Sequence, residues 1–193
     1  MLGRFNVSNA LGVLGCLVAN GIPLQNARQL LAGLPPVPGR MQAVGQAPLV
    51  VIDYAHTPDA LENVLNALRP VARERGGRLA VVFGAGGDRD PTKRPLMGAV
   101  AARLADRVLV TSDNPRSEDP RAIIAQIAAG IRTTHEVEAD RARAIEQAVL
   151  QAASSDVVLI AGKGHETYQE IGGRRSEFSD AEQAQKALAR RPA

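Results

Sequence analysis

The stretch Arg107-Val108-Leu109-Val110-Thr111, which continues into Ser112-Asp113-Asn114-Pro115-Arg116-Ser117-Glu118-Asp119-Pro120, decides the fold. An apolar run of strand length ends in a polar loop, and a helical pattern begins near residue 120. Strand, loop and helix in this order are the repeating unit of α/β proteins, whose ligands bind beyond the carboxyl ends of the strands. A lone Asp-Asn-Pro sequence is usually an ordinary turn. The neighbouring strands make a ligand loop the better interpretation.

The same unit repeats on both sides of this loop. Apolar runs predict strands at residues 49–54, 79–83, 107–111 and 156–161, a short strand around Val137 and an edge segment at 168–171. Helical patterns cover residues 58–72, 95–104, 120–129, 141–153 and 180–190. Residues 40–193 are therefore expected to form an α/β domain, a Rossmann-like, doubly wound and mostly parallel sheet with right-handed crossovers.

The first residues follow a different pattern. Residues 6–20 and 23–32 have helical spacing, and Leu34-Pro35-Pro36-Val37-Pro38-Gly39 has the composition of a stiff linker. Two short helices cannot bury their apolar faces alone. Residues 1–33 are therefore expected to be the helical tail of a preceding domain, joined by the linker at 34–39 to the α/β domain at 40–193.

The composition excludes several classes of protein. The chain has 193 residues, a formal net charge of +3 and only 3% aromatic residues, which argues against a nucleic-acid surface. No signal peptide is expected, and no apolar run is long enough to span a bilayer. Its single cysteine, Cys16, permits no disulfide within the chain. A cytoplasmic protein without nucleic-acid or membrane partners is expected.

Polar residues also follow the strand at 49–54, in the sequence Asp53-Tyr54-Ala55-His56-Thr57-Pro58-Asp59. Asp53 can accept hydrogen bonds from ribose hydroxyls, and His56 can approach a phosphate or a carboxylate. Alternatively, Asp53 and Thr57 cap the next helix. The residues by themselves leave both interpretations open.

Glycines follow the strand at 79–83, in Gly84-Ala85-Gly86-Gly87-Asp88-Arg89-Asp90. Their backbone amides can approach an anion. The spacing matches neither the dinucleotide-binding motif nor the Walker A loop. The alternative is a solvated surface loop with weak local ion pairs.

The strand at 156–161 ends in Gly162-Lys163-Gly164-His165-Glu166. Glu166 can accept an ammonium group, while the planar guanidinium of Arg116 can bind a carboxylate at two points. Together they complement an amino acid. Four polar strand ends predict one ligand cleft at this edge of the sheet.

Six sequence blocks together resemble the Mur ligases of peptidoglycan synthesis, a step of cell wall biogenesis. The blocks are Gly3-Arg4-Phe5-Asn6-Val7-Ser8-Asn9-Ala10, Pro38-Gly39-Arg40-Met41, Asp53-Tyr54-Ala55-His56-Thr57-Pro58, Gly86-Gly87-Asp88-Arg89-Asp90, Asp113-Asn114-Pro115-Arg116 and Gly162-Lys163-Gly164-His165-Glu166. Within that family, the Asp-Asn-Pro-Arg loop is similar to that of members that add meso-2,6-diaminopimelate to UDP-N-acetylmuramoyl-L-alanyl-D-glutamate.

The resemblance implies roles for individual residues. The diaminopimelate pocket would consist of Arg89, Asp113, Asn114, Arg116, Gly162 and Glu166. The ATP-binding residues would be Asn9, Arg40, Asp53 and His56, with Asn9 near the adenine and Asp53 at the ribose. The resemblance implies no catalytic residue and no metal site in this part of the chain.

The sequence also departs from the family pattern. A complete Mur ligase has a UDP-sugar domain, a central ATPase domain and a carboxy-terminal domain, and it uses ATP and Mg²⁺. The phosphate-binding loop, the acidic magnesium ligands and the modified lysine of the central domain do not occur in these residues. The chain is therefore expected to be a carboxy-terminal fragment, inactive alone, with Met1 an artefact.

Two alternatives remain. One is a ligase similar to folylpolyglutamate synthase, which shares the architecture, although Asp113-Asn114-Pro115-Arg116 and Gly162-Lys163-Gly164-His165-Glu166 argue against it. The other is a free-standing module that binds an amino acid or a nucleotide without catalysis.

Overall fold

The computed structural model describes residues 4–35 and 37–191, with side chains described from residue 6 onward. It contains a six-stranded sheet in the order β1-β2-β6-β3-β4-β5. The strands are β1 (Gln42–Gln46), β2 (Leu49–Asp53), β3 (Leu79–Phe83), β4 (Arg107–Val110), β5 (Glu136–Val137) and β6 (Val157–Ala161). β1 runs antiparallel to β2, and the other neighbouring strands are parallel. The expected mostly parallel sheet is confirmed.

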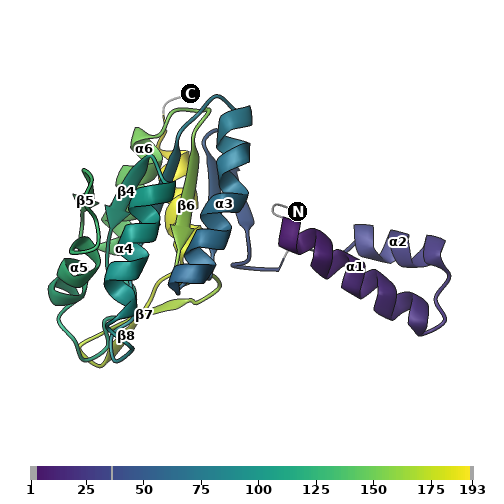
Figure 1. The fold of residues 1–193 in the computed structure, drawn as a ribbon, viewed down its shortest axis with the longest axis horizontal. Coiled ribbons are helices and arrows are strands. Elements are labelled where there is room, and N and C mark those ends of the chain that lie inside the picture. The colour runs from purple at the N-terminus through teal and green to yellow at the C-terminus, as the bar shows by residue number, and fades with distance from the viewer. Residues whose placement is uncertain (1–3, 36, 192–193) are drawn as a thin grey trace.

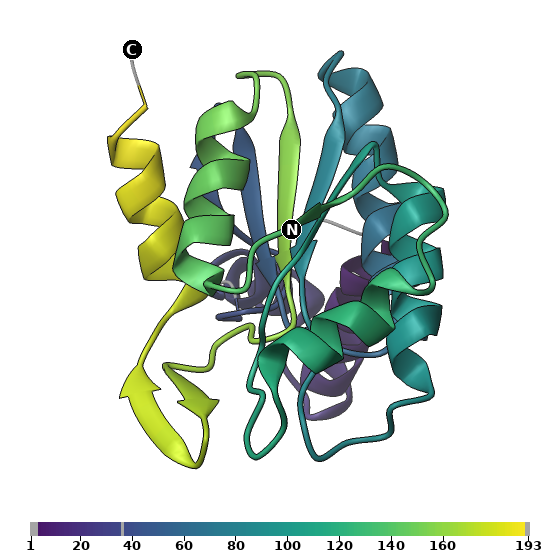
Figure 2. The same cartoon turned by 90° about the vertical axis from the view of Figure 1, so that its left-hand side faces the viewer.

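Helices cover both faces of this sheet (Figures 1 and 2). One face packs against α3 (Pro58–Glu74), α4 (Lys93–Leu104) and α5 (Pro120–Ala128). The other packs against α6 (Arg141–Gln151) and α7 (Asp180–Ala189). This two-sided cover is the doubly wound arrangement that the alternating sequence pattern predicts.

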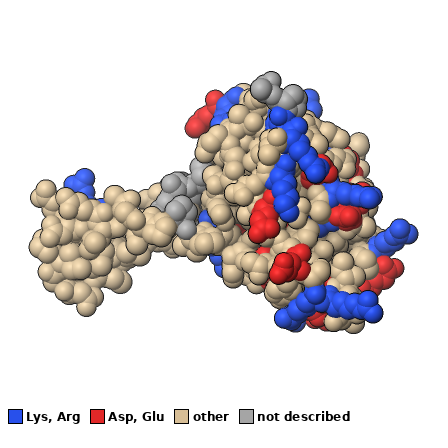
Figure 3. All heavy atoms as spheres, turned by 180° about the vertical axis from the view of Figure 1, so that it is seen from behind, with Lys and Arg blue, Asp and Glu red and all other residues tan. Residues whose placement is uncertain are grey.

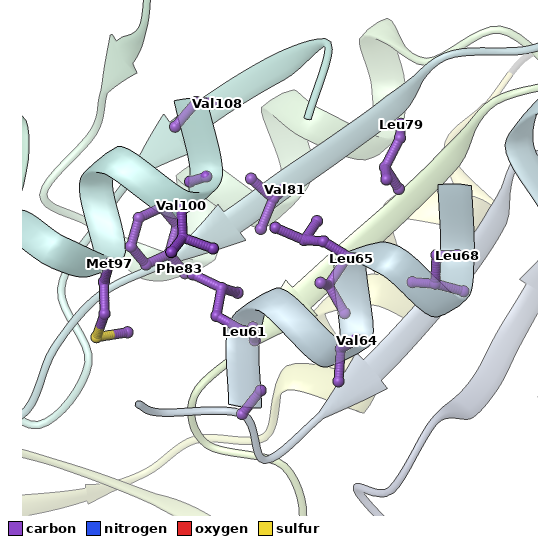
Figure 4. Close-up of a cluster of buried hydrophobic side chains, with 14 of the residues drawn as sticks. Leu61, Val64, Leu65, Leu68, Leu79, Val81, Phe83, Met97, Val100 and Val108 are labelled. Atoms are coloured by element: carbon purple, nitrogen blue, oxygen red, sulfur yellow. The ribbon is translucent and has the colours of Figure 1, made fainter. Parts of the chain in front are cut away.

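The central strand β3 shows why the apolar runs are continuous. Leu79, Val81 and Phe83 belong to the core beneath α3 and α4, which Figure 4 shows in close-up. Ala80 and Val82 belong to the core beneath α6. Successive strand residues point to opposite faces of a sheet, so a strand covered on both faces must be apolar throughout.

The edge segment expected at residues 168–171 has a different place in the fold. β7 (Tyr168–Ile171) pairs antiparallel with β8 (Arg174–Glu177) in a separate two-stranded sheet, so the prediction of an edge strand is wrong. Gly172 and Gly173 connect the two strands with φ angles of 57° and 73°. Two successive left-handed residues make the tight turn that closes a hairpin on itself.

One edge strand of the main sheet is β1, which the sequence pattern does not reveal. Most of its residues are polar or small, and none is fully buried. A Cβ on Gly45 would lie 2.6 Å from Leu188 Cδ1, so the glycine lets α7 pack closely over this edge. Tertiary packing, and not an alternating pattern, specifies this strand.

The two expected N-terminal helices are present as α1 (Arg4–Ala19) and α2 (Leu24–Ala32). They pack on each other and stand apart from the α/β body (Figure 1). Ala27 is buried between them, whereas Val7, Leu11, Leu24 and Leu30 are each more than half exposed. Figure 3 shows the pair as a nearly uncharged surface, and residues 6–35 contain a single charged residue, Arg28. No helix among the described residues is long and apolar enough to cross a bilayer.

Candidate functional site

The carboxyl ends of four parallel strands lie side by side at one edge of the sheet. The strand order places β6 between β2 and β3, with β4 beyond β3. The parallel register aligns Ala161 of β6 with Asp53 of β2 and Phe83 of β3, and Phe83 with Val110 of β4. The polar loops that follow therefore share one edge of the molecule, where the β7–β8 hairpin also lies (Figures 1 and 2, lower part).

Asn114, Lys163 and Glu166 form the centre of the candidate site. Lys163 Nζ donates hydrogen bonds to Asn114 Oδ1 (2.9 Å) and Glu166 Oε2 (3.2 Å), and Asn114 Nδ2 donates to Glu166 Oε2 (2.7 Å). The fully buried Lys163 ammonium also lies 5.4 Å from the centre of the Tyr168 ring. Two oxygens and an aromatic face match its three N–H groups. The Glu166 side chain stays 21% exposed, so it can receive a ligand from solvent.

The hairpin supports this centre from one side. The Gln169 side chain, which is buried, donates through Nε2 to Ser112 Oγ (3.0 Å) and to the Asp113 carbonyl (2.8 Å). The Glu170 amide donates to Asn114 Oδ1 (3.0 Å). With both Lys163 and Glu170 donating to Oδ1, the Asn114 amide must present its Nδ2 to Glu166.

The hairpin also holds the backbone of Arg116. The Arg116 amide donates to the Glu170 carbonyl (3.0 Å), and the Gly172 amide donates to the Arg116 carbonyl (2.7 Å). Arg116 has a φ of 54°, in the left-handed region that is unfavourable for residues other than glycine. Such a conformation persists only where surrounding contacts enforce it. Here the contacts come from β7 and the turn after it.

The loop after β3 supports the other side of Arg116. The Gly87 amide donates to the Asn114 carbonyl (2.9 Å), and Arg116 NH1 donates to the Gly87 carbonyl (2.5 Å). A Cβ on Gly87 would lie 1.8 Å from the Pro115 carbonyl oxygen, so only glycine allows this contact. The glycine-rich loop is packed against the Asp-Asn-Pro-Arg loop.

Arg89 approaches Arg116 beside Gly86. A Cβ built on Gly86 would lie 2.9 Å from Arg116 NH1 and 3.6 Å from Arg89 Cγ, so both arginine side chains lie against this glycine. Arg89 is exposed and Arg116 is partly buried. The two guanidinium groups make this part of the edge suitable for an anion.

The buried Arg94 joins the loop after β3 to the loop after β4. Arg94, 2% exposed, donates to both carboxylate oxygens of Glu118 (2.8 Å each), to Gln126 Oε1 (2.7 Å) and to the Gly86 carbonyl (3.2 Å). Glu118 also accepts from the Asp88 amide (2.6 Å). Together, the Arg94 side chain and the Asp88 amide lower the pKa of Glu118 to about 2. Arg94, which follows the glycine-rich loop, is therefore a buried structural residue and not a solvated surface charge.

A second buried arginine lies behind the centre of the site. Arg141 donates to both carboxylate oxygens of Asp180 (2.7 Å each), and neither side chain is exposed. It also donates to the carbonyls of Ser112 (3.1 Å) and Ala161 (3.0 Å). Arg141 therefore joins the ends of β4 and β6. Burial raises the pKa of the nearby Asp113 carboxyl, although the Arg141 and Lys163 charges act in the opposite direction.

Asp53 lies at the end of β2 with its carboxylate buried. Its two oxygens accept from the Met41 amide (2.9 Å) and the Ala55 amide (2.8 Å). Burial raises the pKa of Asp53, and these hydrogen bonds and the Arg40 charge partly offset that shift. The exposed Arg40 guanidinium lies 4.8 Å from the centre of the Tyr54 ring. Asp53 thus joins the segment that follows the linker to the end of β2.

Two histidines flank the Tyr54 ring. The His56 ring lies edge-on at 4.7 Å, and the His165 ring lies at 5.7 Å, measured between ring centres. His56 Nδ1 donates to the Tyr54 carbonyl (2.8 Å). Thr57 caps α3 by accepting from the Ala60 amide, whereas Asp53 bonds elsewhere, so the capping alternative is right only for Thr57.

The linker touches the loop that carries Glu166. A Cβ on Gly39 would lie 2.2 Å from the His165 amide nitrogen, and one on Gly164 would lie 2.7 Å from Tyr54 Cβ. Both glycines have positive φ, 68° and 56°. Backbone packs directly on backbone here, which requires glycine on both sides.

The structure brings most of the candidate amino-acid residues together. Asp113 and Asn114 follow β4, and Gly162 and Glu166 follow β6 on the other side of β3, yet the two loops are in contact. Arg116 faces the loop that carries Arg89. A Cβ on Gly162, whose φ is 120°, would lie 2.3 Å from Asp113 Oδ2, which shows how closely these two turns pack.

The candidate nucleotide residues are brought together only in part. Arg40 and His56 lie against Tyr54, the residue after Asp53. Asn9 lies on the separate α1 helix, where Nδ2 donates to Asn6 Oδ1 (3.4 Å). Among the residues that the structure describes, no three histidine, cysteine, aspartate or glutamate side chains are grouped to hold a metal ion.

Sequence reasoning missed three residues that organise the site: Gln169, Arg141 and Asp180. Gln169 lies in a polar segment, and Arg141 and Asp180 lie in the first turns of helices, where charged residues are common. Their burial depends on packing between elements distant in sequence, so no local pattern reveals it.

A family model described as "Mur ligase, glutamate ligase domain" matches residues 39–164. The chain belongs to the Mur ligase family. Among the relatives of this Mur ligase chain, the UDP-N-acetylmuramoyl-L-alanyl-D-glutamate--2,6-diaminopimelate ligase of Acidovorax sp. (strain JS42) is 59% identical over 195 residues. The match covers 99% of the chain and 39% of that protein.

Solved structures agree with this assignment. A structure of a UDP-N-acetylmuramoyl-L-alanyl-D-glutamate--2,6-diaminopimelate ligase has a TM-score of 0.74 and 44% identity, covering 98% of this Mur ligase chain and 39% of that chain. The bifunctional folylpolyglutamate synthase/dihydrofolate synthase of Yersinia pestis has a TM-score of 0.61 and 28% identity, covering 79% and 35%. The chain spans about two-fifths of the length of the curated relatives it matches.

Proposed function

We propose that this chain is the amino-acid-binding part of an ATP-dependent ligase that adds meso-2,6-diaminopimelate to UDP-N-acetylmuramoyl-L-alanyl-D-glutamate in peptidoglycan synthesis. The observation that carries the proposal is the cluster of Asn114, Lys163 and Glu166 next to Arg116, at the carboxyl edge of the sheet. The name of the Acidovorax relative supports the same reaction. We place the activity in the cytoplasm.

The charges of the cluster fit an amino-acid head group. Glu166 has a partly exposed carboxylate for an ammonium group, and Arg116 and Arg89 offer guanidinium donors for a carboxylate. Diaminopimelate carries two such head groups, whereas lysine lacks the second carboxylate. A site that supplies a guanidinium for this carboxylate discriminates against lysine, because lysine leaves the donor without a partner. Asp113 and Gly162 would complete the pocket wall.

The contribution to the reaction is positioning. ATP, when bound, activates the glutamate carboxylate of the acceptor for attack by an amine. Glu166 and Asn114 would orient the incoming amino acid so that its amine lies at attack distance, while Arg116 and Arg89 hold its carboxylate. Correct placement of a nucleophile can lower a barrier by about 7–11 kcal/mol.

The nucleotide would be held by this chain on one side only. Arg40 and His56 are exposed cationic or polar groups that can approach phosphates, and Asp53 retains lone pairs for ribose hydroxyls. Asn9 would join them only after the helix pair moves relative to the body. We assign the Mg²⁺ and the phosphate-binding loop to the part of the longer protein that precedes this chain, and no step here passes through them.

The same proposal covers the domain organisation. Residues 1–33 would be the helical end of a central ATP-binding domain, residues 34–39 the linker and residues 40–193 the carboxy-terminal domain. The exposed apolar side chains of α1 and α2 support this division, since another part of the longer protein can cover them. In this arrangement the missing UDP-sugar and central domains are the partners of the chain.

The test is Arg116→Ala in the full-length ligase, with steady-state kinetics for diaminopimelate and for ATP. Loss of a charged hydrogen bond costs about 1.5–3 kcal/mol, so the KM for diaminopimelate should rise about 10- to 150-fold. The KM for ATP should stay within about twofold. A change in the ATP value without a change in the diaminopimelate value would contradict the assignment of this loop.

Two further measurements test binding by this chain and the alternative of a free-standing binding module. Titration calorimetry on this 193-residue chain should give heat with diaminopimelate and less with lysine, because only the former engages Arg116. A full-length protein that binds diaminopimelate and hydrolyses no ATP in the presence of the acceptor would favour the module.

A further inference from the structure

We propose that the β7–β8 hairpin is a specificity-determining element of the amino-acid site and that Gln169 is its main positioning residue. Gln169 would act on the ligand through Arg116 and Asn114 and would not touch it. This inference rests on the proposed function, which assigns those two residues to diaminopimelate. It adds an element outside the main sheet to the machinery that selects the substrate.

The hairpin contributes little to the main fold. It forms its own two-stranded sheet, and β8 is exposed at all four residues. Its two strands contribute no member to either hydrophobic core cluster among the described residues. The contacts of β7 are instead directed at residues 112–116. The hairpin is absent from both cores, and its first strand and turn are bonded to the binding loop, so it is placed to position that loop.

The backbone conformation of Arg116 depends on this hairpin. Its left-handed φ of 54° is unfavourable, and the bonds that hold its amide and carbonyl both come from the hairpin, from Glu170 and Gly172. The structure also records a bridge between Arg116 and Ile171. If the hairpin moved away, the backbone of Arg116 would relax and its guanidinium would leave the Gly86–Gly87 turn.

Gln169 fixes the position of the hairpin on the loop. Its side-chain amide is buried, and its two N–H groups are used on the Ser112 hydroxyl and the Asp113 carbonyl. Ser112 Oγ in turn donates to the Ala139 carbonyl (2.8 Å), which anchors it to the segment before α6. Gln169 is therefore the side-chain link between the hairpin and the fixed end of β4.

Specificity follows from which ligand group each residue meets. Loss of the hairpin support displaces Arg116, which the proposed function assigns to the second carboxylate, a group that lysine lacks. Use of diaminopimelate should therefore suffer more than use of lysine. A purely structural defect would lower the active fraction for both substrates equally and leave their KM values unchanged.

The first test is kinetic and uses the full-length ligase with Gln169→Leu and the milder Gln169→Asn, which is one methylene shorter. We expect the KM for diaminopimelate to rise about tenfold in Gln169→Leu, the scale of two neutral hydrogen bonds. The preference for diaminopimelate over lysine should fall by a similar factor, with the KM for ATP unchanged. Gln185→Leu, the same change at an exposed position of α7 outside the hairpin, is the matched control and should change none of these values.

The second test does not require activity. Amide hydrogen exchange on this 193-residue chain should show Arg116 and Gly172 protected, and Gln169→Asn should speed their exchange at least tenfold. The amides of Val82 and Ile160 in the sheet should keep their exchange rates. Unchanged exchange at Arg116 would overturn the inference whatever the substrate proves to be.

The two tests separate the possible failures. A wild-type ligase that does not use diaminopimelate refutes the proposed function, and the exchange data then decide the role of the hairpin alone. A wild-type ligase that uses diaminopimelate, with a Gln169→Leu variant that lowers turnover equally for both substrates, refutes the hairpin inference and leaves the proposed function standing.

Discussion

The helix pair α1–α2 and the α/β body place their apolar side chains in opposite ways. In the pair, Leu11 is 62% exposed and Ala27 is buried, whereas in the body Leu65 and Phe83 are completely buried. The body even buries charged groups, such as Arg141, which pairs with Asp180. The body buries its apolar side chains within itself, and the pair has an apolar surface that nothing in the described chain covers.

This difference indicates that the α/β body, and not the helix pair, provides most of the stability of this chain. A helix pair of 25 helical residues that buries little apolar area gains little free energy beyond its own weak helix propensity. The body gains from two cores, one on each face of the sheet. Variants placed in the two regions should therefore have very different effects on unfolding.

The largest effect is expected from a buried charge in the body. Arg141→Met leaves the Asp180 carboxylate buried without its cation, which costs about 3–5 kcal/mol of unfolding free energy. Urea unfolding followed by circular dichroism measures this cost. The matched variant is Arg175→Met, whose ion pair with Glu170 is exposed and contributes about 0–1 kcal/mol. Equal costs for the two variants would show that the Arg141 pair does not stabilise the body.

The next effect compares the same substitution in the two regions. Leu65→Ala removes a fully buried side chain of α3 and should cost about 2–5 kcal/mol. Leu11→Ala on the exposed face of α1 should change the unfolding free energy of the body by less than about 0.5 kcal/mol. A large cost for Leu11→Ala, measured in the same urea titration, would mean that the pair and the body unfold as one unit.

The smallest effect is a change in pH dependence within the body. The pKa of Glu118 is about 2 in the folded chain, below its ordinary value of 4.5, because of Arg94. A lowered folded-state pKa stabilises the fold above the unfolded-state pKa, and this contribution is lost as the pH falls toward the folded-state value. Wild type should therefore exceed Glu118→Gln in unfolding free energy more at pH 5 than at pH 3.

Urea titrations at the two pH values measure this difference. Glu177→Gln on the exposed strand β8 serves as the control for removing a carboxylate at the surface. A stability difference that grows on acidification would have the wrong sign for a carboxylate held by Arg94.

The sequence predicted the frame of the body because its strands are continuous apolar runs. The strand at 79–83 has the predicted bounds, and the loops at 84–90, 112–119 and 162–166 follow strands as expected. β1 and β8 were missed since the former is small and polar and the latter is fully exposed. Local sequence patterns detect strands that bury apolar side chains, and β1 and β8 bury few of theirs.

The sequence alone could not predict which residues of the site contact each other. Residues 162–166 reach Asn114 and Tyr54 because β6, the last strand of the main sheet in the chain, inserts between β2 and β3. Strand order is a global property that strand and helix patterns do not encode. For the same reason the partnership of Gln169 with Ser112, across 57 positions, had no local indication.

The contact between Gly39 and the Gly164–His165 peptide has a consequence for movement. If the body turns about the linker, the linker moves against the peptide that precedes Glu166, the residue proposed to bind the amino acid. Rotation about the linker would then shift the position of Glu166 through a direct backbone contact. Gly39→Ala or Gly164→Ala would separate these two backbone segments. We expect either substitution to uncouple domain closure from amino-acid binding in the proposed ligase.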